Sequence, residues 1–390
     1  MMRKITADRI LLPTGCFVSG QMLLFDDTGK LLDITEDSGS EDVERFNGII
    51  IPGFINTHCH LELSYLKNAI PRGTTLPGFI RDFSKQRREA PEEQIENAAI
   101  NAAGEMWNQG IQGAGDICNR ANTVNIKKGS PIRWHNFIEV FGLDESKSAE
   151  LFDAANALCE QFILSGLAAS VVPHAPYSVP PALFNLIASH HPTHAPWSIH
   201  SQESNAENRL FRQGEGKFAE VFAEMGINTN ALPLLTTDAF GYCLSHVPSN
   251  GNLLFVHNTV ATKEDLELIS KNGLLNRSWM ALCPKANQYI EGRLPDIPML
   301  MDSGIRLTIG TDSLASNNSL NMLDELKTIH SEYPKINGAD MLTWATRNGA
   351  QYFGWSDLGS FTKGNAPGCV LIETDQCDEI SQWQNTMRII

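Results

Sequence analysis

The chain is organised around one stretch, Ile50-Ile51-Pro52-Gly53-Phe54-Ile55-Asn56-Thr57-His58-Cys59-His60-Leu61-Glu62. An apolar, β-branched run follows the Pro-Gly break and ends in two histidines that are one residue apart. Because side chains alternate between the two faces of a strand, His58 and His60 are expected to point one way and Cys59 the other. Two imidazoles at the end of a buried strand supply half of a metal site. An isolated pair of this kind is equally compatible with a hydrogen-bonded pair in the core.

From about residue 50 onward, apolar strands alternate with helical stretches, which is typical of a parallel α/β domain. After the histidine pair, strands are predicted at 111–117, 133–141, 168–174, 197–200, 252–257, 279–283 and 306–312. Eight strands with intervening helices predict a (β/α)₈ TIM-like barrel. A doubly wound open sheet is the rival, but no glycine-rich phosphate loop follows the first strand.

The sequence pattern at both ends of the chain differs from that of the middle. Short strand-like runs separated by turn-forming residues fill the first 50 positions, and a similar run returns at 368–372. The C-terminal run is too short to fold alone. We therefore expect a small β-sandwich domain made of residues 1–52 and 359–390, beside a barrel domain at 53–358.

Composition excludes several classes of partner. The 390 residues carry a net charge of −15, and no Lys/Arg block stands out, which argues against nucleic acid and against an anionic membrane surface. No apolar run approaches the ~20 residues that a membrane span requires, and no signal-peptide core follows the N-terminus. Eight scattered cysteines without a C-x-x-C pair predict reduced thiols and a cytoplasmic location.

Imidazole and carboxylate groups gather where the predicted strands end. These residues are His58, His60, His174, His200, His257 and Asp312. In a barrel the catalytic side chains lie at that rim, so the set predicts a metal site, although a single histidine there would more often be structural. The other histidines lie within a strand, a helix or a loop and are assigned no role.

Three imidazoles and one carboxylate suit Zn²⁺, with Fe²⁺ as the second choice, and they leave one coordination position for water. We take the ligands to be His58, His60, His200 and Asp312. The strand at 168–174 offers no lysine near its end that could be carbamylated to bridge a second ion. One divalent metal ion is therefore expected.

Two acids have alternative interpretations. Glu203 follows His200 by three residues and could shuttle protons over the pocket without binding the metal, or it could be a first-turn acid of a helix. Beside a metal the catalytic interpretation is favoured. Asp116 closes the strand at 111–117, and we interpret it as a structural ion-pair or loop-fixing residue.

These residues resemble the amidohydrolase superfamily, and within it the deaminase/chlorohydrolase branch that includes adenosine-type and guanine deaminases. The matching stretches are 52–61, 173–178, 200–204, 283–287 and 310–320. The resemblance implies that Glu203 is the proton shuttle, that His257 and Asp312 hydrogen-bond the attacking water, and that His174 touches the substrate. It implies hydrolytic deamination: water adds to the ring carbon bearing the amine, a ring nitrogen is protonated, and ammonia leaves.

The substrate is less well indicated. The sequence at 60–64, His-Leu-Glu-Leu-Ser, looks most like the aminodeoxyfutalosine deaminase group, whose substrate is an adenine nucleoside bearing a benzoate. S-adenosylhomocysteine/methylthioadenosine deaminases usually have a Trp-Leu-Glu-type segment near the ribose, but here residues 76–81 lack the acid. Glu62 could hydrogen-bond a polar substrate group, or it could be a solvated loop acid.

Three hypotheses therefore stand. The first is a metal-dependent aminohydrolase acting on a small heterocycle, with an adenine-like nucleoside as first choice. The second is a hydrolase of another bond, in a cyclic amide, a guanidine or a chloro-heterocycle. The third is a non-catalytic barrel used as a binding scaffold, which would be expected to have lost some of these ligands. A homodimer is possible by analogy with related barrels.

Overall fold

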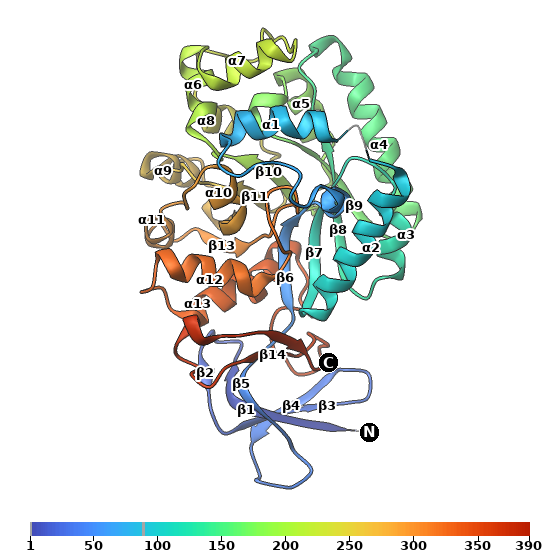
Figure 1. Ribbon diagram of the computed structural model, residues 1–390, viewed down its shortest axis with the longest axis vertical. Helices are drawn as coiled ribbons and strands as arrows, with labels where there is room; N and C mark the ends of the chain where they lie inside the picture. Colours follow the sequence, from blue (N-terminus) through green and yellow to red (C-terminus); the bar gives the residue numbers. More distant parts are fainter. Residues whose placement is uncertain (1, 88–89) are drawn as a thin grey trace.

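The computed structural model describes residues 2–87 and 90–390. A parallel α/β body lies above a sheet that contains both ends of the chain (Figure 1). The strands are β1 (Arg3–Leu11), β2 (Phe17–Val18), β3 (Gln21–Phe25), β4 (Leu31–Glu36), β5 (Glu44–Ile51), β6 (Phe54–Cys59), β7 (Ile111–Cys118), β8 (Arg133–Val140), β9 (Ala168–Pro173), β10 (Trp197–Ser201), β11 (Leu253–His257), β12 (Ser278–Leu282), β13 (Arg306–Ile309), β14 (Val370–Glu373) and β15 (Thr386–Arg388).

Helices connect and cover the strands of the body. The α-helices are α1 (Thr75–Gln86), α2 (Glu92–Asn108), α3 (Val124–Gly129), α4 (Ser148–Leu164), α5 (Pro181–His190), α6 (Asn205–Gln213), α7 (Lys217–Glu224), α8 (Ala239–Leu244), α9 (Lys263–Lys271), α10 (Pro284–Ile290), α11 (Ile297–Asp302), α12 (Met322–Glu332), α13 (Gly338–Thr343) and α14 (Gly349–Phe353). Within the described ranges, no helix combines the length and apolar character that crossing a bilayer requires. All eight cysteines are free thiols.

The predicted parallel strands are present as two four-stranded sheets, with the orders β6-β7-β8-β9 and β10-β11-β12-β13. Across the described residues no continuous ladder joins the sheets, but a few hydrogen bonds connect their edges. The His200 N–H donates to the His174 carbonyl at 3.0 Å, and the Asp312 N–H donates to the His58 carbonyl at 3.1 Å. The carboxyl ends of β9 and β10, and of β6 and β13, are therefore held together, which brings the predicted site residues to one rim.

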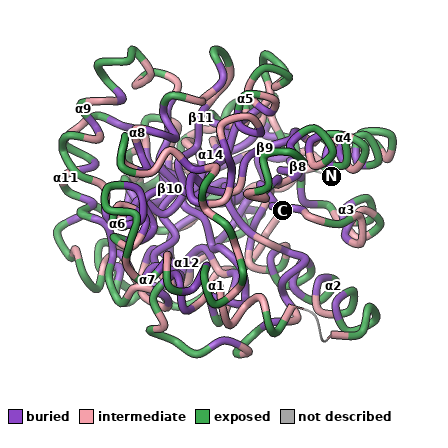
Figure 2. The backbone as a smooth tube through the Cα atoms, turned by 90° about the horizontal axis from the view of Figure 1, so that it is seen from above, coloured by how far each residue is buried: buried purple, intermediate pink, exposed green. Residues whose placement is uncertain are grey.

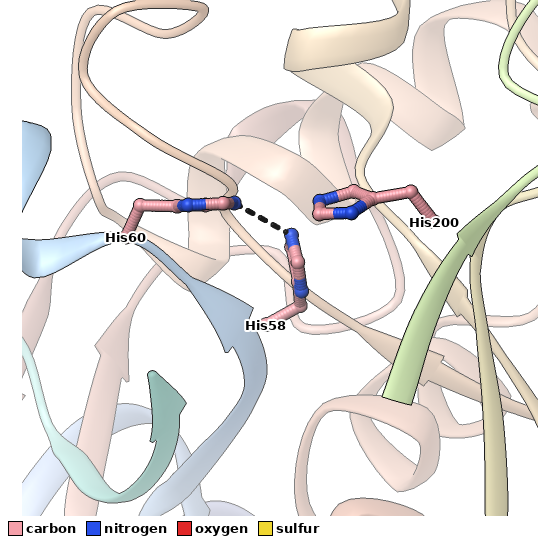
Figure 3. Close-up of side chains that lie close together, drawn as sticks. All are labelled: His58, His60 and His200. Atoms are coloured by element: carbon pink, nitrogen blue, oxygen red, sulfur yellow. Dashed lines mark hydrogen bonds between the residues drawn. The ribbon is translucent and has the colours of Figure 1, made fainter. Parts of the chain in front are cut away.

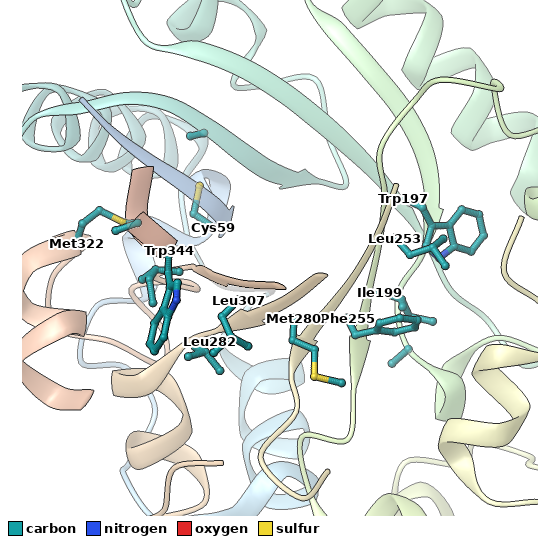
Figure 4. Packing of buried hydrophobic residues seen from close by; sticks show 14 of the residues in the cluster. Cys59, Trp197, Ile199, Leu253, Phe255, Met280, Leu282, Leu307, Met322 and Trp344 are labelled. Atoms are coloured by element: carbon teal, nitrogen blue, oxygen red, sulfur yellow. The ribbon is translucent and has the colours of Figure 1, made fainter. Parts of the chain in front are cut away.

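Side chains along each strand alternate between two buried layers. On β11, Leu253 and Phe255 join the large core cluster between strands and helices, whereas Leu254 and Val256 belong to a separate cluster inside the ring of strands. Figure 4 shows part of the outer layer. Seen from above, buried strands occupy the centre and exposed residues concentrate on the surrounding helices (Figure 2). The interior cluster fills the ring below the rim, so the rim is where a ligand can enter.

Strands from both termini form one seven-stranded sheet, and the predicted two-layer sandwich is not confirmed. Its order is β15-β14-β5-β1-β3-β4, with β2 paired to β1. The C-terminal strand β14 adds antiparallel to the edge of β5, with Val370 opposite Ile51, instead of starting a second layer. The prediction that the two ends of the chain pair is confirmed, and the domain boundaries at 52/53 and 358/359 stay a prediction.

A buried ion pair fixes the loop that follows the histidine pair. The Lys127 ammonium contacts the Asp116 carboxylate and donates to Asn136 Oδ1 at 2.6 Å, and both charged side chains are fully buried. Asp116 Oδ1 also accepts from the Leu61 N–H at 2.6 Å, one residue beyond His60. Burial opposes the charge on Lys127, but Asp116 outweighs it and raises the pKa of the amine. The interpretation of Asp116 as an ion-pair and loop-fixing residue is confirmed.

We expect Lys127→Met to lower the free energy of unfolding by about 3–5 kcal/mol, because it leaves the Asp116 carboxylate buried without a counter-charge. Urea denaturation measures the effect. Lys128→Met is the matched control, since Lys128 is exposed and a surface change is worth about 0.5 kcal/mol or less. Equal stability of the two variants would show that the pair does not hold this loop.

Candidate active site

Three histidines from two strands meet at the rim. His58 lies on β6, His60 follows it directly, and His200 lies on β10; their rings point toward one another (Figure 3). The Nε2 atoms of His58 and His60 are 3.1 Å apart. One ring nitrogen from each of the three histidines lies within 4.8 Å of the others. The expected alternation is confirmed, because Cys59 packs in the outer core cluster.

Asp312, which follows β13 in the sheet that also contains His200, completes the group. Its Oδ1 lies 3.3 Å from His60 Nε2 and 3.7 Å from His58 Nε2. The Ser316 hydroxyl donates to its other oxygen at 2.5 Å. Burial works against ionisation of Asp312, but the facing imidazoles hold its pKa well below the usual range.

The donor atoms fit a divalent cation. Burial lowers the pKa of His58 to about 4, so its imidazole is neutral near pH 7. His200 Nδ1 donates to the His174 carbonyl at 2.9 Å, which leaves its Nε2 as the lone-pair nitrogen. Burial opposes a charge on His60, but Asp312 outweighs it and raises the pKa of that imidazole. A positive charge is therefore favoured at this point, and a cation bound between the donor atoms can supply it. That arrangement is typical of a metal centre.

Two of the site residues lie in strained backbone. Asp312 has φ +56° and His257 has φ +76°, both in the left-handed region that bulky residues rarely adopt. Strand alternation alone would place His257 on the outer face with Phe255, and the left-handed turn redirects it. His257 then lies within 4.8 Å of donor atoms of His58 and Asp312. Such strain is concentrated at functional sites.

Glu203 faces His257, with 3.7 Å between Oε2 and Nε2. His257 is oriented from behind, because its Nδ1 donates to Asn287 Oδ1 at 2.9 Å. Burial and the nearby Asp312 raise the pKa of Glu203 well above its usual value. The alternative of a first-turn helix acid is wrong for Glu203, since Ser204 and Glu207 form the capping box of α6.

His174 and Glu62 have different surroundings. The His174 ring lies 4.9 Å from the His200 ring, lines the cavity, and hydrogen-bonds Ser178 Oγ through Nδ1 at 2.7 Å. Glu62 is only 4 % exposed, so the interpretation as a solvated loop acid is wrong. Its Oε2 accepts from the Asn119 and Arg120 N–H groups at 3.0 and 3.2 Å. Glu62 does not line the cavity, so the structure gives its predicted substrate contact no support.

A cavity of about 540 Å³ opens above the histidine cluster. One part of its lining is apolar. These residues include Leu76, Phe79, Ile80, Phe83, Phe222 and Met225. Arg87, Asn119 and Glu139 bring polar atoms to the same cavity. An apolar enclosure with a few placed polar groups is the usual form of a small-molecule site.

Sequence reasoning missed Glu139, near the carboxyl end of β8. Its side chain is 5 % exposed, and its Oε1 lies 3.6 Å from His200 Nδ1. The signal was weaker than at the other site residues, because Glu139 lies two residues before the end of the predicted strand at 133–141. It was overlooked because the ligand set was already complete without it.

Comparison with known proteins identifies relatives that share most of the chain. A protein of Helicobacter pylori named adenosine deaminase is 28% identical over 310 residues, 78% of this chain and 74% of that one. An aminodeoxyfutalosine deaminase of Deinococcus radiodurans is 25% identical over 326 residues, 80% of this chain and 75% of its own.

A solved structure shows that the fold is also shared. The crystal structure of H. pylori aminofutalosine deaminase with methylthio-coformycin superposes with a TM-score of 0.84 at 22% identity, covering 100% of both chains. The sequence profile of the amidohydrolase family matches residues 49–390, which include every residue of the site. The chain therefore belongs to the amidohydrolase family.

Proposed function

We propose that this protein is a metal-dependent hydrolase that releases ammonia from an adenine-like nucleoside, with an aminodeoxyfutalosine-type substrate as first choice. One observation carries the proposal: the three-imidazole and carboxylate cluster and the Glu203–His257 pair lie together at the base of a single cavity. The relatives named adenosine deaminase and aminodeoxyfutalosine deaminase support the reaction class.

In this proposal the metal is held by four residues from strands far apart in sequence. They are His58, His60, His200 and Asp312. Zn²⁺ is the first choice for these nitrogen and oxygen donors, and Fe²⁺ is the second. The ion supplies Lewis acidity, which makes water a competent nucleophile at neutral pH.

Glu203 is assigned the proton transfers between water and substrate, and His257 and Asp312 are assigned the positioning of the water. Glu203 delivers a proton to the ring nitrogen beside the carbon that bears the amine, and its raised pKa favours the protonated acid that this step requires. His257 and Asp312 hydrogen-bond the incoming water and orient it. Asn287 holds His257 in one ring orientation for this task.

The cavity supports a substrate larger than adenosine. Its apolar wall at α1 and α7 could cover an aromatic substituent, and Arg87 lines the cavity near that wall. The Arg87 guanidinium lies 5.6 Å from the Phe83 ring and donates to Asn119 Oδ1 at 3.1 Å. An aryl carboxylate such as a benzoate suits this combination of apolar surface and one guanidinium.

An ammonia-release screen tests the reaction. The metal-loaded protein is assayed with adenosine, adenine nucleosides with apolar or aryl-carboxylate 5′ substituents, guanine, pterins and aminopyrimidines, beside a chloro-triazine and a cyclic amide. We expect ammonia from the adenine nucleosides, fastest from the aryl carboxylate. Turnover of the halide or the cyclic amide with no turnover of any amine would refute deamination.

Glu203→Gln tests the proton shuttle. We expect metal content to stay near that of the unchanged protein, while kcat falls about 10²–10⁴-fold because proton transfer is lost. Metal analysis and steady-state kinetics on the same sample separate the two effects. Glu215→Gln, on an exposed acid, is the control and should leave kcat unchanged. Loss of the metal from this variant would identify Glu203 as a metal ligand and not as the proton shuttle.

Asp312→Ala tests the carboxylate ligand. We expect metal affinity to fall by more than the 10–100-fold that loss of an outer hydrogen-bond partner typically costs, and activity to fall with it. Elemental analysis after dialysis against a weak chelator gives the metal content. Asp302→Ala, at the exposed end of α11, is the control. Full retention of metal by the Asp312 variant would contradict the assignment.

A further inference from the structure

One wall of the cavity carries a chain of polar contacts that the proposed reaction does not use. Arg87 donates to Asn119 Oδ1 at 3.1 Å, and Asn119 Nδ2 donates to Glu139 Oε2 at 3.3 Å. Asn119 Nδ2 also reaches the backbone carbonyl of Glu139 at 3.3 Å. The amide of Asn119 is thus oriented by both neighbours, and it fixes one oxygen of Glu139.

Among residues 2–87 and 90–390, the other oxygen of Glu139 meets no hydrogen-bond donor. Oε1 is buried and unpaired, while the whole side chain is 5 % exposed. An unpaired buried acceptor costs about 1–3 kcal/mol, and more when it is charged. Glu139 is one of the residues that line the cavity, so a donor on a ligand can approach its carboxylate.

Glu62, a second acid near Arg87, differs from Glu139 because its carboxylate is bound by groups of the protein itself. Glu62 Oε2 accepts from two backbone N–H groups, and its Oε1 lies 3.6 Å from Arg87 Nη2. The two backbone N–H groups hold Glu62 in place, and Glu62 does not line the cavity. Of these two acids, Glu139 is the one available to a ligand.

The surroundings of Glu139 do not suit a second cation. Glu139, His174 and His200 each place one polar atom within 4.8 Å of the others. However, the nitrogen of His200 nearest to Glu139 is Nδ1, 3.6 Å away, and this nitrogen donates its proton to the His174 carbonyl. It has no lone pair to offer a metal. The free oxygen is better matched by a neutral donor such as a hydroxyl group.

The order of the strands places Glu139 away from the reacting end of the substrate. Glu203 and His257 come from the end of β10 and from β11, whereas His174 and Glu139 come from β9 and β8 on the other side of His200. If the aminated ring is held at Glu203, its substituent lies toward β8 and β9. Residues 76–81 contribute no acid to this region.

We propose that Glu139 is a specificity-determining residue that accepts hydrogen bonds from the vicinal hydroxyls of the nucleoside sugar. The inference rests on the proposed function, and it specifies the part of the substrate that Glu139 recognises. A carboxylate only accepts hydrogen bonds, and a sugar diol offers two donors. A ring nitrogen of His174, within 4.8 Å of the acid, can act as second partner of one hydroxyl. Asn119 is the positioning residue.

The test compares two substrates in three proteins. Adenosine and 2′,3′-dideoxyadenosine differ only in the diol, and kcat/KM is measured for both with the unchanged enzyme, Glu139→Leu and Glu139→Gln. We expect the unchanged enzyme to prefer adenosine by about 10–100-fold, because the dideoxy compound leaves a buried acceptor unpaired. Glu139→Leu should abolish most of this preference by slowing adenosine alone, and Glu139→Gln should restore part of it.

Controls separate a sugar contact from a general effect. Glu145→Gln, on an exposed acid, should keep the full preference, and all variants should carry the same amount of metal. Equal slowing of both substrates in Glu139→Leu, or loss of metal, would assign Glu139 to support of His200 and overturn the inference. Deamination without preference for the diol overturns the inference alone. Absence of ammonia from every adenine nucleoside overturns the proposed function together with it.

Discussion

The crowding of three buried imidazoles and one carboxylate at one rim is the constraint on which the rest of the site depends. Imidazole nitrogens of His58 and His60 lie 3.1 Å apart, and the Asp312 carboxylate lies 3.3 Å from the nearer of the two. Such a cluster is unfavourable without a cation, and burial removes the water that would otherwise screen it. The surrounding structure must therefore impose it. The Asp116–Lys127 pair fixes the loop behind His60, and left-handed backbone at Asp312 and its neighbours in the site supplies the remaining geometry.

Much of this arrangement could be predicted from the sequence, for a physical reason. A strand buried on both faces is a largely apolar run, so an imidazole or carboxylate is expected only where that run reaches the rim. That rule locates β6 to β13 and assigns His58, His200 and Asp312 to one rim from the order of residues alone, and the three do lie together there. It also identifies Asp116 as a residue that fixes a loop, which its bond to the Leu61 N–H confirms.

The parts that could not be predicted depend on contacts between distant segments. Whether β14 adds to the edge of β5 or begins a second layer is decided by pairing, and a short apolar run is compatible with both outcomes. The same holds for Glu62, whose charge is compatible with exposure but whose carboxylate is enclosed by Asn119 and Arg120. The left-handed φ of His257 could not be predicted either, because nothing in the sequence of its strand suggests a departure from alternation.

The cavity has an apolar wall and a polar wall, and the two differ in how well they discriminate between substrates. The apolar wall near Phe79 and Phe222 contributes binding energy in proportion to the area it covers, and it discriminates poorly between substituents of similar size. The polar wall discriminates strongly, because a ligand that fails to match a buried acceptor leaves it unpaired. A free oxygen on Glu139 beside a fixed Asn119 is therefore a more selective element than the larger apolar surface. Selectivity in this pocket thus depends on a few hydrogen bonds close to the reacting centre. The apolar wall limits the size of the substituent that can bind.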